Sequence, residues 1–172
     1  MEEQNIILIG FMGAGKTSVG EALARRRGRK LIDTDWLIEE KAGMAISELF
    51  EKQGEAAFRQ LETEVLMQLI SEASGDVISV GGGLPMREEN RELLKKLGTV
   101  VYLSVTPETV LKRLEGDTTR PLLAGEHPER KVRELLDLRT PIYKEACHFE
   151  AAVDGRTVEE LADEIERGVE RI

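Results

Sequence analysis

The chain has little of what would mark a secreted, membrane-bound or nucleic-acid-binding protein. Its single cysteine, Cys147, cannot form an internal disulfide, which fits a reducing compartment. No apolar run approaches the roughly 20 residues that cross a membrane, and the start, MEEQNIILIG, lacks the basic segment of a signal peptide. The 24 Lys and Arg are outnumbered by 33 Asp and Glu, which argues against a general nucleic-acid binder. These absences predict a cytoplasmic protein that binds neither nucleic acid nor a membrane.

What is present is a regular alternation of short apolar runs with amphipathic helical patterns. This alternation predicts a five-stranded parallel sheet covered by helices on both faces, a three-layer α/β/α fold. The 172 residues suffice for one domain spanning 1–172. The expected strands are residues 5–9, 30–33, 76–80, 99–104 and 148–153. The expected helices are residues 16–27, 35–42, 45–53, 55–73, 87–97, 107–115, 129–145 and 158–170.

One segment, EGDTTRPLLAGEHPE at residues 115–129, interrupts this alternation. It is rich in Gly, Thr, Pro and charge and shows little periodicity. Because long irregular stretches inside a compact domain are usually functional, we expect a lid at about 115–128.

The clearest motif is GFMGAGKT at residues 10–17, which has the spacing of a phosphate-binding loop. An apolar run precedes it and a helical pattern follows, so a merely glycine-rich turn is disfavoured. Glycines allow successive backbone N–H groups to face phosphate oxygens, and the next helix presents its positive end to them. Lys16 is expected to reach the β- and γ-phosphates of a nucleotide, and the Thr17 hydroxyl to bind Mg²⁺. The remaining expected nucleotide contacts of the loop are Gly13, Ala14, Gly15 and Ser18.

The sequence lacks the patterns of a GTPase switch, Asn-Lys-x-Asp and Asp-x-x-Gly. A motor-type ATPase would place an acidic residue at the end of a following strand, but the strand at 76–80 runs into Gly81, Gly82 and Gly83. Three consecutive glycines cost backbone entropy and supply no packing. At the end of a central strand they favour a place where a ligand touches the main chain over a merely flexible turn.

Carboxylates appear instead at the end of the second strand, as Asp33 and Asp35. Open α/β sheets bind ligands at this edge, so one carboxylate could lie near Mg²⁺ while the other faces an acceptor hydroxyl. Both could equally cap the helix that follows. Trp36 could line the pocket or pack in the core, and we expect packing.

Two arginines in helical patterns could bind an anion. Arg59 lies three residues before Glu62, so the two could form a solvated surface pair. Alternatively Arg59 points into the crevice and Glu62 holds it in place. The same choice applies to Arg139 within VRELLDLRTPIYKEA.

Together these motifs resemble those of shikimate kinase, over nearly the whole chain. The resemblance rests on GFMGAGKT, DTD at 33–35, GEAAFRQLE at 54–62, GGG at 81–83, TTRPLL at 118–123 and LRTPIYKEA at 138–146. It implies a P-loop kinase fold like that of nucleoside monophosphate kinases, with a mobile lid and a substrate-binding helical segment at about 34–61. It also implies ATP-dependent phosphorylation of the 3-hydroxyl of shikimate, on the route to chorismate and aromatic amino acids.

The resemblance further implies roles for individual residues. Asp33 lies close to Mg²⁺ through water, and Asp35 binds shikimate hydroxyls as the candidate base. Arg120 is the lid arginine over the transferring phosphate. The shikimate carboxylate is bound by Arg59 and Arg139, with the backbone of Gly81, Gly82 and Gly83 alongside. Arg113 matches a family position close to adenine. The segment after the fifth strand, VDGRTVEEL, departs from the family because it lacks a clear signature of the adenine loop, and Arg156 within it is a candidate to stack on the base.

Two alternatives remain at this point. A gluconate kinase or a nucleoside monophosphate kinase would share the fold and the phosphate loop. A non-catalytic nucleotide-binding module would not need Lys16, Asp35 and Arg120 together. Nothing in the chain demands a partner subunit, so we expect a monomer.

Overall fold

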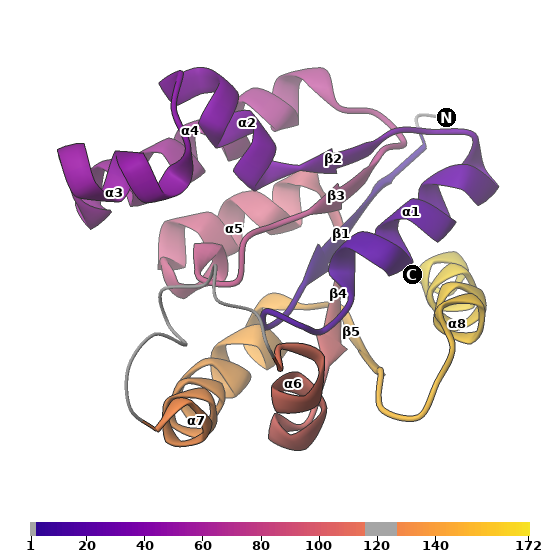
Figure 1. The fold of residues 1–172 in the computed structure, drawn as a ribbon. Coiled ribbons are helices and arrows are strands. Elements are labelled where there is room, and N and C mark those ends of the chain that lie inside the picture. Colours follow the sequence, from indigo (N-terminus) through magenta and orange to yellow (C-terminus); the bar gives the residue numbers. More distant parts are fainter. Residues whose placement is uncertain (1–2, 116–126) are drawn as a thin grey trace.

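The computed structural model describes residues 3–115 and 127–172. In this part of the chain five strands form one sheet in the order β2-β3-β1-β4-β5, with every neighbouring pair parallel (Figure 1). The predicted five-stranded parallel sheet is therefore confirmed. The strands are β1 (Asn5–Ile9), β2 (Leu31–Asp33), β3 (Val77–Ser79), β4 (Gly98–Ser104) and β5 (Phe149–Ala152).

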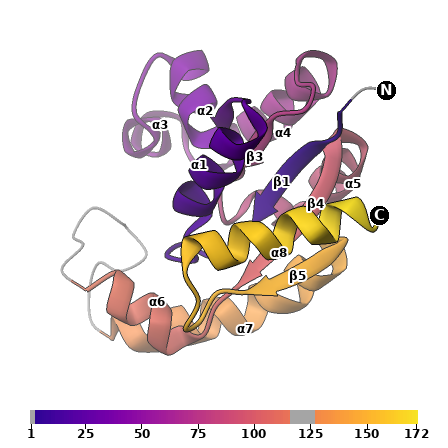
Figure 2. The same cartoon turned by 90° about the vertical axis from the view of Figure 1, so that its right-hand side faces the viewer.

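Helices cover both faces of the sheet, which gives the three predicted layers (Figures 1 and 2). On one face α1 (Lys16–Arg27) packs against α8 (Val158–Glu170), which lies across the sheet in Figure 2. The other face carries α4 (Glu55–Glu72), α5 (Glu88–Leu97) and α7 (Pro128–Ala146). The remaining elements are α2 (Thr34–Ala42), α3 (Ile46–Gln53), α6 (Pro107–Arg113) and the 3₁₀ turn Leu84–Met86. Most of the predicted lid, residues 116–126, lies outside the described residues.

The central strand of the sheet, β1, is buried on both faces. All five residues of β1 are buried, and Ile6, Ile7, Leu8 and Ile9 have no exposed surface. This burial explains the continuous apolar run, because a parallel strand between two helical layers has no solvent-facing side.

The strand order brings three distant loops together. β2, β3 and β1 are neighbours, and their register pairs Asp33 with Ser79 and Ser79 with Leu8. Since the three strands are parallel, their C-terminal ends meet at one edge, where such sheets bind ligands. The phosphate loop, the glycines at 81–83 and the acidic pair all begin at this edge.

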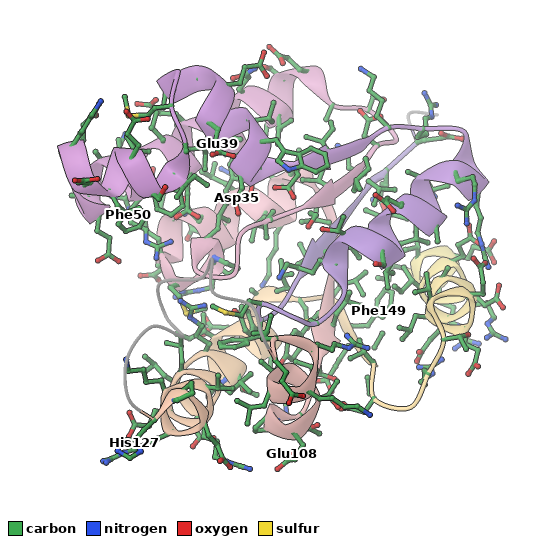
Figure 3. All side chains as sticks on the ribbon, in the orientation of Figure 1. Asp35, Glu39, Phe50, Glu108, His127 and Phe149 are labelled. Carbon is green, nitrogen blue, oxygen red and sulfur yellow. The ribbon has the colours of Figure 1, made fainter. Side chains whose placement is uncertain are left out.

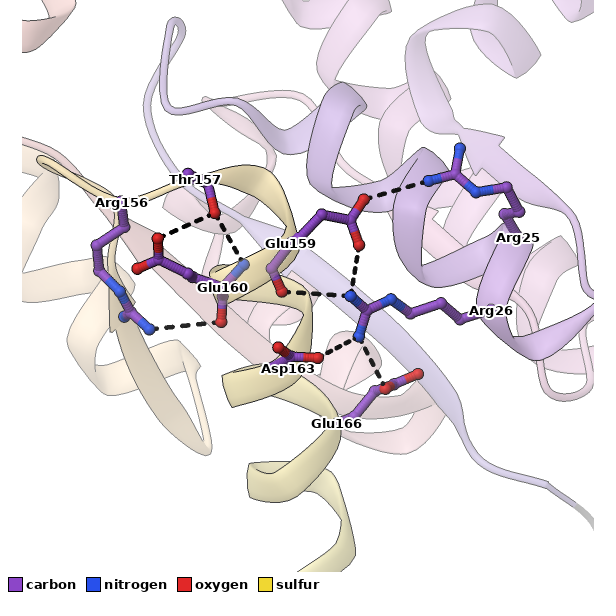
Figure 4. A network of polar contacts seen from close by, with 8 residues as sticks. All are labelled: Arg25, Arg26, Arg156, Thr157, Glu159, Glu160, Asp163 and Glu166. Atoms are coloured by element: carbon purple, nitrogen blue, oxygen red, sulfur yellow. Dashed lines mark hydrogen bonds and ion pairs between the residues drawn. The ribbon is translucent and has the colours of Figure 1, made fainter.

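The C-terminal helix is fastened to α1 by ion pairs that Figure 4 shows from close by. Arg26 of α1 bonds Glu159, Asp163 and Glu166 of α8, with N–O distances of 2.5, 2.6 and 3.3 Å. Arg25 adds a longer pair of 3.4 Å with Glu159. The contacts tie the end of the chain to the helix that follows the phosphate loop.

Candidate active site

A cleft of about 390 Å³ opens at the C-terminal ends of β1, β2 and β3. Residues from the phosphate loop, the start of α2, the glycine turn, α4 and α7 line it. The structure thus brings together residues that the sequence holds more than a hundred positions apart. The predicted site residues in its wall are Gly13, Gly15, Lys16, Thr17, Ser18, Asp33, Asp35, Arg59, Gly81, Gly82, Gly83 and Arg139.

The phosphate loop joins β1 to α1. Gly13 and Gly15 have φ angles of 79° and 92°, left-handed values that the curl of the loop requires and glycine readily adopts. The Lys16 ammonium donates to the carbonyl oxygens of Gly10 and Phe11, at 2.7 and 3.1 Å. The first turn of α1 contains no acidic side chain, so nothing there competes with an anion for the positive end of the helix.

Of the acidic pair, Asp33 is the helix cap that the alternative interpretation proposed. Its side chain accepts a hydrogen bond of 2.8 Å from the backbone N–H of Asp35, and α2 begins at Thr34. Burial raises the pKa of Asp33, although the N–H groups of Asp35 and Trp36 and the charge of Lys16 act in the opposite direction. Figure 3 shows Asp35 at the start of α2, where its half-buried side chain lines the cleft.

The expectation for Trp36 was wrong. Its side chain is 54 % exposed and neither packs in the core nor lines the cleft. Helix α2 buries Thr34 and Ile38 against the rest of the protein. On a helix, a residue two positions from both of these points away from the buried face.

Glycines at positions 81 and 83 make room for charged side chains. A Cβ on Gly81 would lie 2.8 Å from the Asp35 Oδ1 atom. A Cβ on Gly83 would lie 2.6 and 2.7 Å from the two terminal nitrogens of Arg59. Real Cβ contacts are longer than this, so glycine is needed for the observed positions of both side chains. Sequence reasoning expected these glycines to expose main chain, and it missed that they also admit side chains.

Arg59 and Glu62 do not form a solvated surface pair. Glu62 has no exposed surface, and its Oε1 accepts a hydrogen bond of 2.7 Å from Arg59. The Arg59 guanidinium also lies over the ring of Phe58, 5.1 Å from its centroid. Burial raises the pKa of Glu62 to about 7, against the lowering effect of Arg59. The buried carboxylate therefore orients the arginine, whose guanidinium reaches the cleft.

Arg139 comes from α7 and is 9 % exposed. Its guanidinium lies 5.7 Å from the centroid of the Phe11 ring and 3.2 Å from where a Cβ on Gly82 would be. The hydroxyl of Tyr143 donates to the carbonyl oxygen of Gly82 at 2.6 Å. Burial raises the pKa of Tyr143 to about 12, although the charge of Arg139 and a hydrogen bond between the two side chains act in the opposite direction, so Tyr143 stays a neutral donor beside Arg139.

Sequence reasoning missed Phe11 and Tyr143 as supports of Arg139. A signal for Tyr143 existed in the i, i+4 spacing within LRTPIY, which puts it on the same helical face as Arg139.

Three further predicted residues, Arg113, Ala14 and Arg156, are not among those that line the cleft. Arg113 of α6 donates to the carbonyl oxygen of Gly13 at 2.8 Å, so it reaches the phosphate loop. Ala14, within the phosphate loop, is buried. Arg156 bonds Glu164 and the carbonyl oxygens of Ala152 and Glu160, the last of which Figure 4 shows. Arg120 lies outside the described residues.

The oxygen atoms near the phosphate loop suit a Mg²⁺ ion that binds together with a nucleotide. Residues 3–115 and 127–172 contain no group of three or more His, Cys, Asp or Glu side chains that could enclose a metal ion. Mg²⁺ in nucleotide sites uses one or two protein ligands together with phosphates and water. The Thr17 hydroxyl and the Asp33 carboxylate in one cleft fit that pattern.

Two adjoining half-sites define the class of this protein. One is a phosphate loop between a buried strand and a helix, and the other is a polar crevice with two arginines and two carboxylates. Together with the parallel sheet they define a P-loop kinase that acts on a small molecule.

No helix in the part of the chain that the structure describes could cross a membrane.

Comparison with known proteins identifies the family. The model of the shikimate kinase family matches residues 12–170. The shikimate kinase of Thermodesulfovibrio yellowstonii is 44 % identical over 169 residues, which cover 98 % of this chain and 96 % of that protein. A shikimate kinase of Acinetobacter baumannii (strain AYE) is 45 % identical over 161 residues, 94 % of this chain and 89 % of that protein.

Solved structures agree. The shikimate kinase of Acinetobacter baumannii in complex with shikimate superposes with a TM-score of 0.92 at 43 % identity, covering 98 % of this chain and 94 % of that one. For the shikimate kinase of Aquifex aeolicus the TM-score is 0.80 at 35 % identity, with coverage of 97 % and 96 %. The chain belongs to the shikimate kinase family.

Proposed function

We propose that the protein transfers the γ-phosphate of ATP to the 3-hydroxyl of shikimate, its family's step in the shikimate pathway. One observation carries the proposal beyond the family. Arg59 and Arg139 converge on the glycine turn beside Asp35, within the same cleft as the phosphate loop. The two arginines can bind a carboxylate, and Asp35 can accept a hydrogen bond from a substrate hydroxyl. Both groups line the same cleft as the loop that would hold the phosphates of ATP.

The donor half of the site is the phosphate loop. Its backbone N–H groups and the positive end of α1 bind the phosphates of ATP, and Lys16 exchanges its two loop carbonyls for the β- and γ-phosphates. Thr17 and, through water, Asp33 would hold Mg²⁺. The bound ion would supply positive charge to neutralise the phosphate oxygens.

The acceptor half binds shikimate by its carboxylate and its hydroxyls. Planar guanidinium groups bind a carboxylate bidentately, which suits Arg59 and Arg139. Asp35 accepts a hydrogen bond from the 3-hydroxyl, orients its oxygen toward the γ-phosphate and takes its proton. The three glycines leave the backbone of the turn accessible to the ligand.

Catalysis then consists mainly of positioning and charge neutralisation, because phosphoryl transfer passes through a loose transition state. Lys16 faces the charge that develops on the γ-phosphate. Arg120 would add a second positive charge over the transferring group, and the segment around it would exclude water, which otherwise hydrolyses ATP. Both roles rest on the family resemblance.

Recognition of adenine is proposed for Arg113 and Arg156. Arg113 already contacts the loop at Gly13, so a base stacked on its guanidinium would lie next to the phosphates. Arg156 would have to loosen its contacts with Glu164 and α8. We also propose that the active form is a monomer.

The substrate is tested by measuring ADP release from MgATP with the purified protein. We expect turnover with shikimate and none above background with gluconate, with AMP or without an acceptor. Equal turnover with gluconate or with a nucleoside monophosphate would reject the proposed substrate. Equal ATP hydrolysis without any acceptor would reject transfer.

A further inference from the structure

The buried carboxyl group of Glu62 is one of four charged groups in the acceptor half of the cleft. Its Oε1 is bonded to Arg59, whereas its Oε2 is buried and accepts no hydrogen bond from any described residue. A buried carboxylate oxygen without a partner is costly when it carries charge and much less so when it is protonated.

Charged side chains from three helices affect the pKa of Glu62. They are Arg59 of its own helix α4, Asp35 of α2 and Arg139 of α7. A Cβ on Gly81 would lie 3.4 Å from the Glu62 Oε2 atom and 2.8 Å from the Asp35 Oδ1 atom, so both carboxylates approach the same point of the glycine turn. Two arginines and two ionised carboxylates balance in charge.

A ligand carboxylate at Arg59 and Arg139 disturbs that balance. It adds a third negative charge to the cluster, and it competes with Glu62 for the Arg59 guanidinium. Because Glu62 is the carboxyl group with no exposed surface, its charged form is the least well solvated, and protonating it restores the balance at the lowest free energy.

We propose that Glu62 is a positioning residue that takes up a proton from solvent when a carboxylate ligand binds Arg59. The inference rests on the proposed function, since it takes shikimate as that ligand. Protonated Glu62 still offers Oε1 as an acceptor to Arg59, and its Oε2 gains a proton that it can donate to a neighbouring oxygen. The arginine therefore stays oriented while its positive charge becomes available to the ligand.

The acidity of the group suits this role. Burial raises the pKa of Glu62 to about 7, with Arg59 and Arg139 acting against burial and Asp35 adding to it. A bound carboxylate raises the pKa further. Well below pH 7 most of the group is already protonated, so binding takes up little. Above pH 7 binding requires a proton, and the affinity falls as the pH rises.

The test is isothermal titration of the nucleotide-free protein with shikimate, in buffers of equal pH and different ionisation enthalpy. At pH ~7.5 we expect uptake of about half a proton or more per shikimate bound, and a roughly tenfold rise in Kd between pH ~6.5 and ~8.5. The methyl ester of shikimate, which carries no charge, should bind weakly and without proton uptake.

Two matched variants assign the proton. Glu62→Gln keeps an oxygen for Arg59 and should abolish both the uptake and the change of Kd with pH. Glu55→Gln removes the other carboxylate paired with Arg59, an exposed one at 3.5 Å, and should leave the uptake intact.

Shikimate binding with a heat that is independent of the buffer would overturn the inference and leave the proposed function standing. Uptake that persists in Glu62→Gln would also overturn it. No shikimate binding at all would overturn both. If Glu62→Gln does not fold, the methyl ester still tests whether the uptake depends on the ligand carboxylate, and Asp35→Asn, which should keep the uptake, tests whether the other carboxylate of the cleft takes the proton.

Discussion

Replacing Gly83 by alanine should move Arg59 without disturbing the fold. The backbone of Gly83 has φ −89° and ψ −9°, which alanine adopts without strain. The added Cβ would lie 2.6, 2.7 and 2.9 Å from the Nη1, Nη2 and Cζ atoms of Arg59. These atoms are the end of a flexible side chain, so the guanidinium moves aside and the backbone stays in place.

The expected cost falls on shikimate binding. A hydrogen bond to a charged group contributes about 1.5–3 kcal/mol. Since each ~1.4 kcal/mol corresponds to a factor of ten, Gly83→Ala should raise the KM for shikimate roughly 10- to 150-fold. The KM for ATP should hardly change. Alanine also reduces the freedom of the unfolded chain, which offsets part of any loss in the Arg59–Glu62 ion pair, so Tm should stay close to that of the unaltered protein.

The assay is steady-state kinetics with each substrate varied, combined with a thermal melt. A double-mutant cycle with Arg59→Ala shows whether the glycine acts through the arginine. In the Arg59→Ala background the Gly83→Ala change should have almost no further effect. Gly28→Ala is the control, since its φ of 61° and open surroundings predict a lower Tm and an unchanged KM.

Two results would contradict this role of Gly83. One is an unchanged KM for shikimate in Gly83→Ala. The other is a rise of the same size with and without Arg59, because the glycine would then contact the substrate directly.

Three further predictions concern the supports of the site. Arg139→Ala should raise the KM for shikimate far more than the KM for ATP in steady-state kinetics; comparable effects on both would contradict its role as a carboxylate clamp. Arg26→Ala breaks three ion pairs to α8 and should lower Tm more than Arg25→Ala, which breaks one; the difference should shrink in ~1 M salt. Equal losses of Tm at all salt concentrations would mean that these ion pairs do not stabilise the packing of α8 on α1. Tyr143→Phe leaves the Gly82 carbonyl without its donor and should lower the free energy of unfolding by about 0.5–1.5 kcal/mol in urea titrations; an unchanged value would show that this bond contributes nothing.

The positions of the phosphate loop and the acidic pair could be predicted from the sequence because they depend on local pattern. An apolar run, a glycine-rich loop and a helical pattern define β1, the loop and α1. Parallel strands then place Asp33 and Asp35 at the same edge as Lys16, whatever the details of packing.

Orientation of single side chains could not be predicted in the same way. The spacing of Arg59 and Glu62 is the same for an exposed pair and for a buried one, and the structure decides for burial of Glu62. Trp36 is a large aromatic residue of the kind often found in cores, yet α2 packs against the protein through Thr34 and Ile38 instead. The need for Gly83 follows from its distance to Arg59, which only the packing of α4 against the turn determines.

The proposed reaction transfers the γ-phosphate of ATP to a single hydroxyl of shikimate. Phosphorus and proton NMR of a reaction with MgATP and shikimate tests it most directly. We expect one new phosphate monoester signal, coupled to the proton on carbon 3 and equal in amount to the ADP formed. Inorganic phosphate in place of the monoester, or a monoester coupled to the proton on another carbon, would contradict it.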